Sequence, residues 1–445
     1  MGAAVRMLRF WGALDVPIDR RSYLLHGFGL AAVKYIGDVA IVWFATGNLW
    51  TPIDYLQSVY SLASTRLPTS VLSALGVWTL PFLWLGITLT VRRVLDAAHS
   101  CWWAFLFFVP YVNYALMAVF AALPSAERVP QEEFPRDGLG IVEGVVSITA
   151  GVVLAMVALA LSVGGLGDYS ATLFFGTPFG MGATTGFLFN RRYGASLRKT
   201  LSVTTMMFAA VAGAAFLFGT EGAVCIAMAL PIALTTGLAG AAVGRVIADA
   251  GQRSTPPMMY ALLALPLSAS LEPSTATVVH EVRTGIEIKA PADLVWPHVI
   301  AFDPIEEPRE MVFRTGVAYP QYARIDGRGV GATRYCVFST GAFVEPVTHW
   351  EVSRRLSFDV VSSPAPLREL SFYENVAPPH LDGYVRPRHG EFRLVPLPGG
   401  RTRLEGSTWY ELEMGPEWYW QIYSDYLIAR IHRRVLEHIK HEVEG

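Results

Sequence analysis

The chain changes composition near Pro273, and this change limits its possible architecture more than any other feature. From about Leu24 to Pro266 the sequence is a succession of long apolar stretches separated by short polar segments. After Val278 charged residues are frequent, and apolar and polar residues alternate as they do in water-soluble domains. The overall content of 52% hydrophobic and 16% charged residues therefore averages two unlike halves. The sequence predicts a membrane half followed by a soluble half.

The first half is predicted to be a multi-pass α-helical membrane domain. A hydrocarbon core of about 30 Å requires a helix of roughly 20 apolar residues, because only a helix satisfies its own backbone groups there. Seven or eight stretches qualify: 24–48, 70–91, 101–122, 140–163, 170–189, 200–218, 221–248 and the short 256–271. The fifth is rich in Gly and Thr and contains Pro178, which favours a broken or re-entrant segment.

Lys and Arg clusters in short loops indicate the cytoplasmic side. The clusters at Arg20–Arg21, Arg92–Arg93 and 191–199 cannot all be cytoplasmic if every stretch crosses, because three spans separate the second cluster from the third. Either one of the third to fifth stretches does not cross, or one cluster breaks the rule, and we favour a non-crossing fifth stretch. It leaves seven spans and an outside C-terminal domain, whereas eight spans place that domain in the cytoplasm.

Two opposite charges, Lys34 and Asp38, occur inside the first predicted span. Their separation of four residues places them on one helix face. Ionisable groups at this depth are either paired or functional. We therefore predict an intramembrane pair that orients helix packing, with an ion or proton pathway as the alternative.

A local motif follows the second predicted span. It consists of two adjacent arginines, an aspartate, two adjacent tryptophans and a proline inside an apolar segment: Arg92, Arg93, Asp96, Trp102, Trp103 and Pro110. This pattern resembles DUF805, a family of bacterial inner-membrane proteins of unknown function. The resemblance implies a DUF805-like membrane region over 1–125 and location in the bacterial inner (cytoplasmic) membrane. The apolar stretches beyond it predict further transmembrane helices over 126–272. Arginines that meet lipid headgroups and tryptophans in the aromatic belt would suit such a motif.

The second half has the pattern of an α+β domain that ends in a long helix. Predicted strands cover 278–289, 317–327, 331–341, 344–350, 355–362, 389–396 and 401–413, with short helices at 292–300 and 304–314. The closing helix is predicted over 416–442, where Trp420, Tyr423 and later apolar residues form one stripe. This order describes a curved antiparallel sheet around a long C-terminal helix.

The start of this half carries a more specific signal. The first strand ends in Ala290–Pro291, and Val295–Trp296 follow on the next helix. In these residues the segment 278–445 resembles the START-like, or SRPBCC, superfamily, which includes polyketide cyclase/dehydrase-like proteins. The resemblance implies a helix-grip fold that holds an apolar ligand between sheet and helix. It does not imply one activity, because the superfamily contains lipid-transfer proteins, cyclases and hydratases.

Two groups of side chains are candidates for the ligand site. An aromatic interior is predicted from Phe338, Trp350, Phe358, Phe372, Trp409, Trp418 and Trp420, with Tyr423 on the helix stripe. The polar candidates are Arg334, Glu345, Glu369, Tyr373, Glu374 and His380. A filled core and ion pairs between the glutamates and Arg334 or Arg368 are the alternatives. The long, Pro-rich connection 364–388 is predicted to be a lid.

Metal, cofactor and nucleic-acid functions are not predicted. Of His432, His438 and His441 on the last helix, at most His438 and His441 share one face; the three cysteines are dispersed, and no basic tract occurs in the soluble half. The predicted partners are membrane lipids and a hydrophobic small molecule. The leading hypothesis is a membrane-anchored domain that binds or transfers a lipid-like molecule. The alternatives are a cyclase- or hydratase-type enzyme and a transporter-like membrane domain with a soluble sensor.

Overall fold

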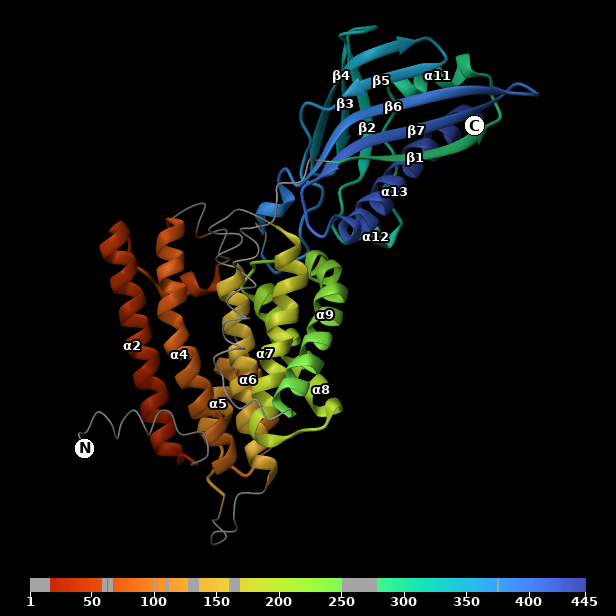
Figure 1. The fold of residues 1–445 in the computed structure, drawn as a ribbon. Helices are drawn as coiled ribbons and strands as arrows, with labels where there is room; N and C mark the ends of the chain where they lie inside the picture. The colour runs from red at the N-terminus through yellow and green to blue at the C-terminus, as the bar shows by residue number, and fades with distance from the viewer. Residues whose placement is uncertain are drawn as a thin grey trace. The chain divides into compact units, whose positions relative to one another are not determined.

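The computed structural model describes residues 17–57, 62, 67–99, 101–108, 112–126, 136–159, 169–249, 278–373 and 376–445. The chain divides into two compact units, a helical unit and a sheet unit (Figure 1). Two short segments belong to a different unit from their neighbours in the sequence. Tyr169–Ala171 belong to the sheet unit, and Ser371–Val376 belong to the helical unit. The eighth predicted span, 256–271, and the boundary at Pro273 lie outside the described residues.

The helical unit contains helices of very different lengths. In chain order they are α2 (Arg20–Thr46), η1 (Pro52–Leu56), α4 (Thr69–Asp96), η2 (Cys101–Phe108), α5 (Val112–Ala122), α6 (Arg136–Leu159), η4 (Thr172–Gly176), α7 (Thr177–Tyr193), α8 (Leu197–Leu217) and α9 (Ala223–Asp249). Among the described residues, α2, α4, α8 and α9 are long and apolar enough to cross a membrane.

Two predicted spans differ from the observed helices. The described residues of the stretch 101–122 form the 3₁₀ helix η2 and the short helix α5, while Pro110 lies outside the described residues. In the fifth stretch, a π-helical turn leads directly into α7. Pro178 lies in the first turn of α7, where a missing N–H is tolerated, so it does not break this helix.

Glycines allow α7 and α9 to pack with their backbones in contact. A Cβ atom on Gly240 would lie 2.1 Å from the Phe179 carbonyl oxygen, and one on Gly182 would lie 1.8 Å from the Gly237 carbonyl oxygen. Helices in membranes associate through such small-residue surfaces, because lipid provides no hydrophobic driving force between helices. The glycines that suggested a broken segment in 170–189 are therefore packing residues.

The sheet unit contains seven antiparallel strands and one long helix. Its elements are β1 (Val279–Ile288), α11 (Ala292–Ile300), α12 (Met311–Arg314), β2 (Pro320–Asp326), β3 (Thr333–Phe338), β4 (Gly341–Glu351), β5 (Arg355–Asp359), η5 (Pro379–Leu381), β6 (Val385–Leu397), β7 (Arg401–Leu412) and α13 (Glu417–Glu444). The strand order is β1-β7-β6-β5-β4-β3-β2. Of the predicted helix 304–314, only its last turn is present, as α12.

The sheet curves around α13. This helix contacts β1 and β7 at one end of the strand order and β2 at the other, which a flat sheet would not allow (Figure 1). Val435, Leu436 and Ile439 pack from the helix into a core that includes Ile288 and Leu404. The predicted helix-grip fold is confirmed by this arrangement.

Candidate functional site

A buried ion pair lies on the helix-facing side of the sheet. Arg334 of β3 and Glu345 of β4 are direct partners in the antiparallel register, so their side chains point the same way. The Arg334 guanidinium donates a hydrogen bond to the Glu345 carboxylate and, through Nε, a second one of 3.3 Å to the Ile300 carbonyl oxygen. Arg334 is 1% exposed and Glu345 is 5% exposed. The two residues that the sequence suggested as partners are thus brought together inside the domain.

Aromatic rings surround this pair. The guanidinium carbon of Arg334 lies 5.3 Å from the Phe358 ring, 5.5 Å from Phe392 and 5.8 Å from Phe302. Burial raises the pKa of the Glu345 carboxyl, and the Arg334 charge opposes this rise. Burial likewise raises the pKa of the Cys336 thiol to about 12, so this cysteine is protonated at neutral pH.

Two predicted aromatic residues complete the interior near the pair. Trp350 of β4 packs edge-on against Trp296 of α11, with ring centroids 5.6 Å apart. Phe338, at the end of β3, packs against Phe343 at 4.7 Å. Both contacts bury apolar area between the sheet and the elements that cover it, so these side chains serve the core as well as any ligand.

Trp420 and Tyr423 lie in the first two turns of α13. Their rings are 6.2 Å apart, and both contact the ring of Tyr419. The indole N–H of Trp420 donates a hydrogen bond of 3.2 Å to the Gly415 carbonyl oxygen. Tyr419, Trp420 and Tyr423 thus form an aromatic cluster at the N-terminal end of α13.

Three aromatic residues expected in the interior point elsewhere. Thr408 and Tyr410 contact α13, and side chains alternate along β7, so Trp409 lies on the opposite face of the sheet. There it packs against His389 at 5.2 Å. Trp418 is exposed on the outer side of α13, and Phe372 is exposed in the segment that belongs to the helical unit.

The predicted lid residues are divided between the two units. Glu369 is buried in the sheet unit, where the neighbouring Arg368 backbone N–H donates a 2.8 Å hydrogen bond to the Gly316 carbonyl oxygen. His380 packs against Tyr169 of the same unit at 5.1 Å. Tyr373 belongs to the helical unit, and its hydroxyl donates to the Leu217 carbonyl oxygen at 2.8 Å. Glu374 lies outside the described residues.

Sequence reasoning missed a row of polar contacts between α13 and the sheet. His432 lies between the hydroxyls of Thr284 and Thr408, at 3.1 and 2.8 Å. One layer along β7, the Tyr410 hydroxyl donates a 2.7 Å hydrogen bond to Asp425. Alternation along β7 and the seven-residue spacing of Asp425 and His432 on α13 were the available signals.

Burial determines the protonation states of His432 and Tyr410 in this row. Burial lowers the pKa of His432 to about 4, so the ring is neutral at pH 7. Burial, together with the neighbouring Asp425 carboxylate, raises the pKa of the Tyr410 hydroxyl. The interface between α13 and the sheet is therefore apolar around Leu436 and polar around His432.

In the helical unit, Lys34 and Asp38 form the predicted pair. The Lys34 Nζ atom lies 2.6 Å from an Asp38 oxygen, and the Tyr55 hydroxyl donates to the same oxygen. The Lys34 ammonium also lies 5.1 Å from the Tyr55 ring centroid. These contacts fix α2 against the η1 segment, as a pair that orients packing would do.

The arginines of the Arg92–Arg93 motif are both buried. Arg93 is fully buried and donates to Asp96 and to the backbone carbonyl oxygens of Phe120 and Leu123. Phe120 belongs to the last turn of α5 and Leu123 directly follows the helix, where carbonyl oxygens lack partners within the helix. The expectation of headgroup contact is thus wrong for Arg93, which joins α4 to the end of α5.

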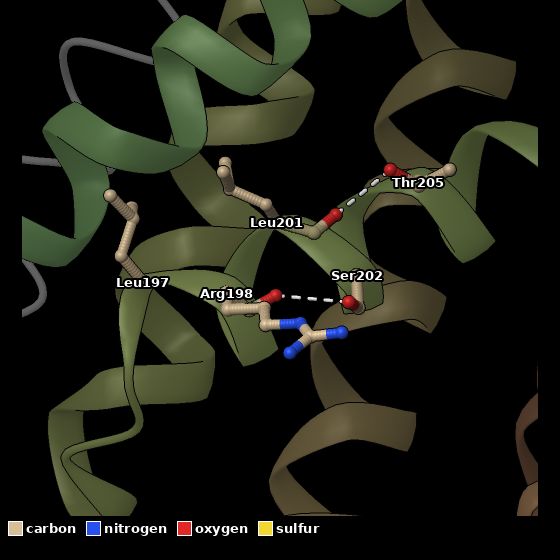
Figure 2. Close-up of a pocket in the computed structure, with 5 residues that line it drawn as sticks. All are labelled: Leu197, Arg198, Leu201, Ser202 and Thr205. Atoms are coloured by element: carbon tan, nitrogen blue, oxygen red, sulfur yellow. Dashed lines mark hydrogen bonds between the residues drawn. The ribbon is translucent and has the colours of Figure 1, made fainter.

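A pocket of about 520 Å³ on α8 is lined by Leu197, Arg198, Leu201, Ser202 and Thr205. Figure 2 shows these five side chains. All five residues come from one face of one helix. The Ser202 and Thr205 hydroxyls donate to the carbonyl oxygens of Arg198 and Leu201, at 2.9 Å each. With its hydroxyls bonded to its own backbone, this surface has the character of a helix face rather than of a binding site.

Comparison with known proteins places the two halves separately. A family model described as "Protein of unknown function (DUF805)" matches the N-terminal part of the chain. Residues 17–131 match the DUF805 family. The match confirms the DUF805 resemblance and covers about a quarter of the chain. No curated protein matches the sequence.

Solved structures resemble the C-terminal half. Truncated norcoclaurine synthase from Thalictrum flavum is 15% identical, with 38% of this chain and 96% of that chain covered and a TM-score of 0.25. The Zhui aromatase/cyclase from Streptomyces sp. R1128 is 15% identical, with 38% and 94% covered and a TM-score of 0.25.

Proposed function

We propose that the sheet unit binds an apolar small molecule with a polar end between its sheet and α13. The helical unit keeps this binding domain at the bacterial inner membrane, where the molecule is taken from or delivered to the lipid. The observation that supports this proposal best is the Arg334–Glu345 pair, buried among phenylalanine rings.

A buried ion pair is an expensive way to fill a core. The desolvation of two charges often exceeds their mutual attraction, and apolar residues of similar volume are commonly as stabilising or more so. A pair at this position is therefore better explained by recognition than by stability. The guanidinium has five N–H donors, and its hydrogen-bond partners are the Ile300 carbonyl oxygen, the Glu345 carboxylate and the Cys336 sulfur. The remaining donors suit an oxygen atom at the polar end of a ligand.

The rest of the site suits the apolar part of such a ligand. Phe302, Phe358 and Phe392 provide apolar surface beside the pair, and Trp420 and Tyr423 extend aromatic surface to the beginning of α13. Ligand sites commonly combine apolar walls with a few placed polar groups. Membrane attachment shortens the path of a molecule that scarcely dissolves in water.

The proposal is tested by identifying what the full-length protein carries. Protein purified in lipid nanodiscs is extracted with organic solvent, and the extract is compared by mass spectrometry with that of empty nanodiscs. We expect one apolar molecule with an oxygen-bearing polar end to be enriched at close to one copy per chain. The proposal is wrong if the extracts are identical and the protein also binds no member of a panel of lipids and apolar acids.

A further inference from the structure

The first turns of α13 carry an apolar stripe on their outer side. Trp418, Ile422 and Tyr426 follow at intervals of four residues, so their side chains lie along one face of the helix. Their exposed fractions are 61%, 60% and 49%. On the inner side of the same turns, Tyr419 and Trp420 are buried. This half of the helix is thus apolar on both sides, whereas an ordinary surface helix is polar on its outer side.

The stripe ends in basic residues. Arg430 continues the four-residue spacing, and its Nε donates a 3.3 Å hydrogen bond to the Tyr426 hydroxyl. Arg433 is exposed one turn further along. The short helix α12 lies beside this part of α13, since the Arg434 guanidinium is 5.9 Å from the Phe313 ring. It adds Met311, which is 70% exposed.

We infer that this outer face of α13 docks into the interfacial region of a lipid bilayer. Trp and Tyr prefer the depth of the lipid headgroups, with Arg extending toward them and aliphatic side chains reaching below. A lipid surface is the favoured partner because the same chain carries helices able to cross a membrane. The last of these ends at Asp249, and only 250–278 separate it from β1. Because the sheet unit is tethered by this segment, the effective concentration of lipid near α13 is high.

Docking of this kind would depend little on lipid charge. Glu306, Glu307 and Glu310 precede Met311 in the sequence and offset the nearby arginines. Electrostatic attraction to anionic lipids is screened by salt, whereas burial of apolar surface is not. We therefore expect the docked state to persist at high ionic strength and in zwitterionic lipid.

The stripe also bears on the ligand path. Trp420 and Tyr423 lie on the inner side of the same helical turns. Docking would therefore bring the aromatic cluster at the N-terminal end of α13 close to the lipid. This consequence rests on the proposed function, whereas docking itself does not.

An environment-sensitive fluorophore tests the inference in the full chain. Cys101, Cys225 and Cys336 are replaced by alanine, and the nitrobenzoxadiazole (NBD) label is attached to Tyr426→Cys in phosphatidylcholine nanodiscs. A matched label goes on Val330→Cys, an exposed apolar residue between β2 and β3 of the same unit. Circular dichroism verifies that each labelled protein is folded. We expect spin-labelled lipid to quench the label at 426 at least twofold more than the label at 330, with no change in 0.5 M salt.

Further variants separate lipid from other partners. Adding Trp418→Ser and Ile422→Ser to the 426-labelled chain should reduce quenching to the level at 330. Equal, weak quenching at both positions would overturn the inference. So would a label at 426 that is shielded equally without lipid and increasingly with protein concentration, because a second copy of the chain would then cover the stripe.

Discussion

At the residue scale, His432 shows how burial fixes a protonation state. Its ring lies between two threonine hydroxyls, and its pKa is lowered to about 4. In the unfolded chain the ring takes up a proton below about pH 6.5. The folded state does not take up this proton until the pH is near 4, so the contribution is complete above pH 6.5 and is lost as the pH falls toward 4.

We predict that the sheet unit loses about 2 kcal/mol of stability between pH 7 and pH 5 through this residue. Hydrogen exchange of the β7 amides, corrected for intrinsic rates, measures this loss. In His432→Gln the same acidification should have a much smaller effect. An unchanged pH dependence in that variant would show that other groups are responsible.

The sequence identified Arg334 and Glu345 as possible partners, but it did not identify the row formed by His432, Tyr410 and Asp425. Arg334 and Glu345 belong to consecutive strands, where a hairpin register can be anticipated from the chain. The other contacts join α13 to β1 and β7, and their pairing depends on how the helix lies across the sheet. Trp418 was assigned to the interior because composition alone does not distinguish the two sides of an apolar helix turn.

At the element scale, the α7–α9 contact depends on the absence of side chains. Replacing Gly240 with alanine puts a Cβ atom 2.1 Å from the Phe179 carbonyl oxygen, so the two helices must separate. We expect Gly240→Ala to destabilise the helical unit by about 2 kcal/mol, measured as a lower Tm of the purified protein. Gly213→Ala is the matched control, because its Cβ meets nothing within 4 Å. In that helical position alanine should be neutral or stabilising by up to about 1 kcal/mol.

The contacts of Arg93 predict that its substitution destabilises the helical unit. Arg93→Gln removes a buried charge that Asp96 and the end of α5 require, and breaking a buried pair costs about 3–5 kcal/mol. The protein should therefore lose its monodisperse peak in detergent at a lower temperature. Arg198→Gln, which changes an exposed arginine of α8, should behave as wild type. Equal behaviour of the two variants would contradict the assigned role of Arg93.

Element prediction succeeded where one face of an element is buried. The predicted strand 401–413 is observed as Arg401–Leu412, and the predicted helix 416–442 as Glu417–Glu444. In both segments the spacing of apolar residues along the sequence has the period of the observed element. The stretch 101–122 is apolar on all sides, so no period indicated that it would form two short helices. Similarly, the glycines of α7 are compatible with a broken helix or a close contact, and only the partner helix distinguishes the two.

At the scale of the whole molecule, the chain joins a unit of long apolar helices to a unit built on a curved sheet. The helical unit includes a DUF805 match and helices that can cross a membrane, and the sheet unit grips α13. We propose that the first holds the second where an apolar ligand is available. The buried Arg334–Glu345 pair is the feature of the sheet unit that this proposal explains and a purely structural role does not.

Replacing both members of the pair tests this central claim most directly. Arg334→Met combined with Glu345→Leu should leave the domain folded, because apolar substitutes for a buried pair are commonly neutral or stabilising. The exposed Glu281–Arg283 pair of β1, changed in the same way, is the control. Mass spectrometry of solvent extracts should show at least tenfold less ligand on the double variant than on wild type and the control. A folded double variant that carries as much ligand as wild type would contradict the proposal.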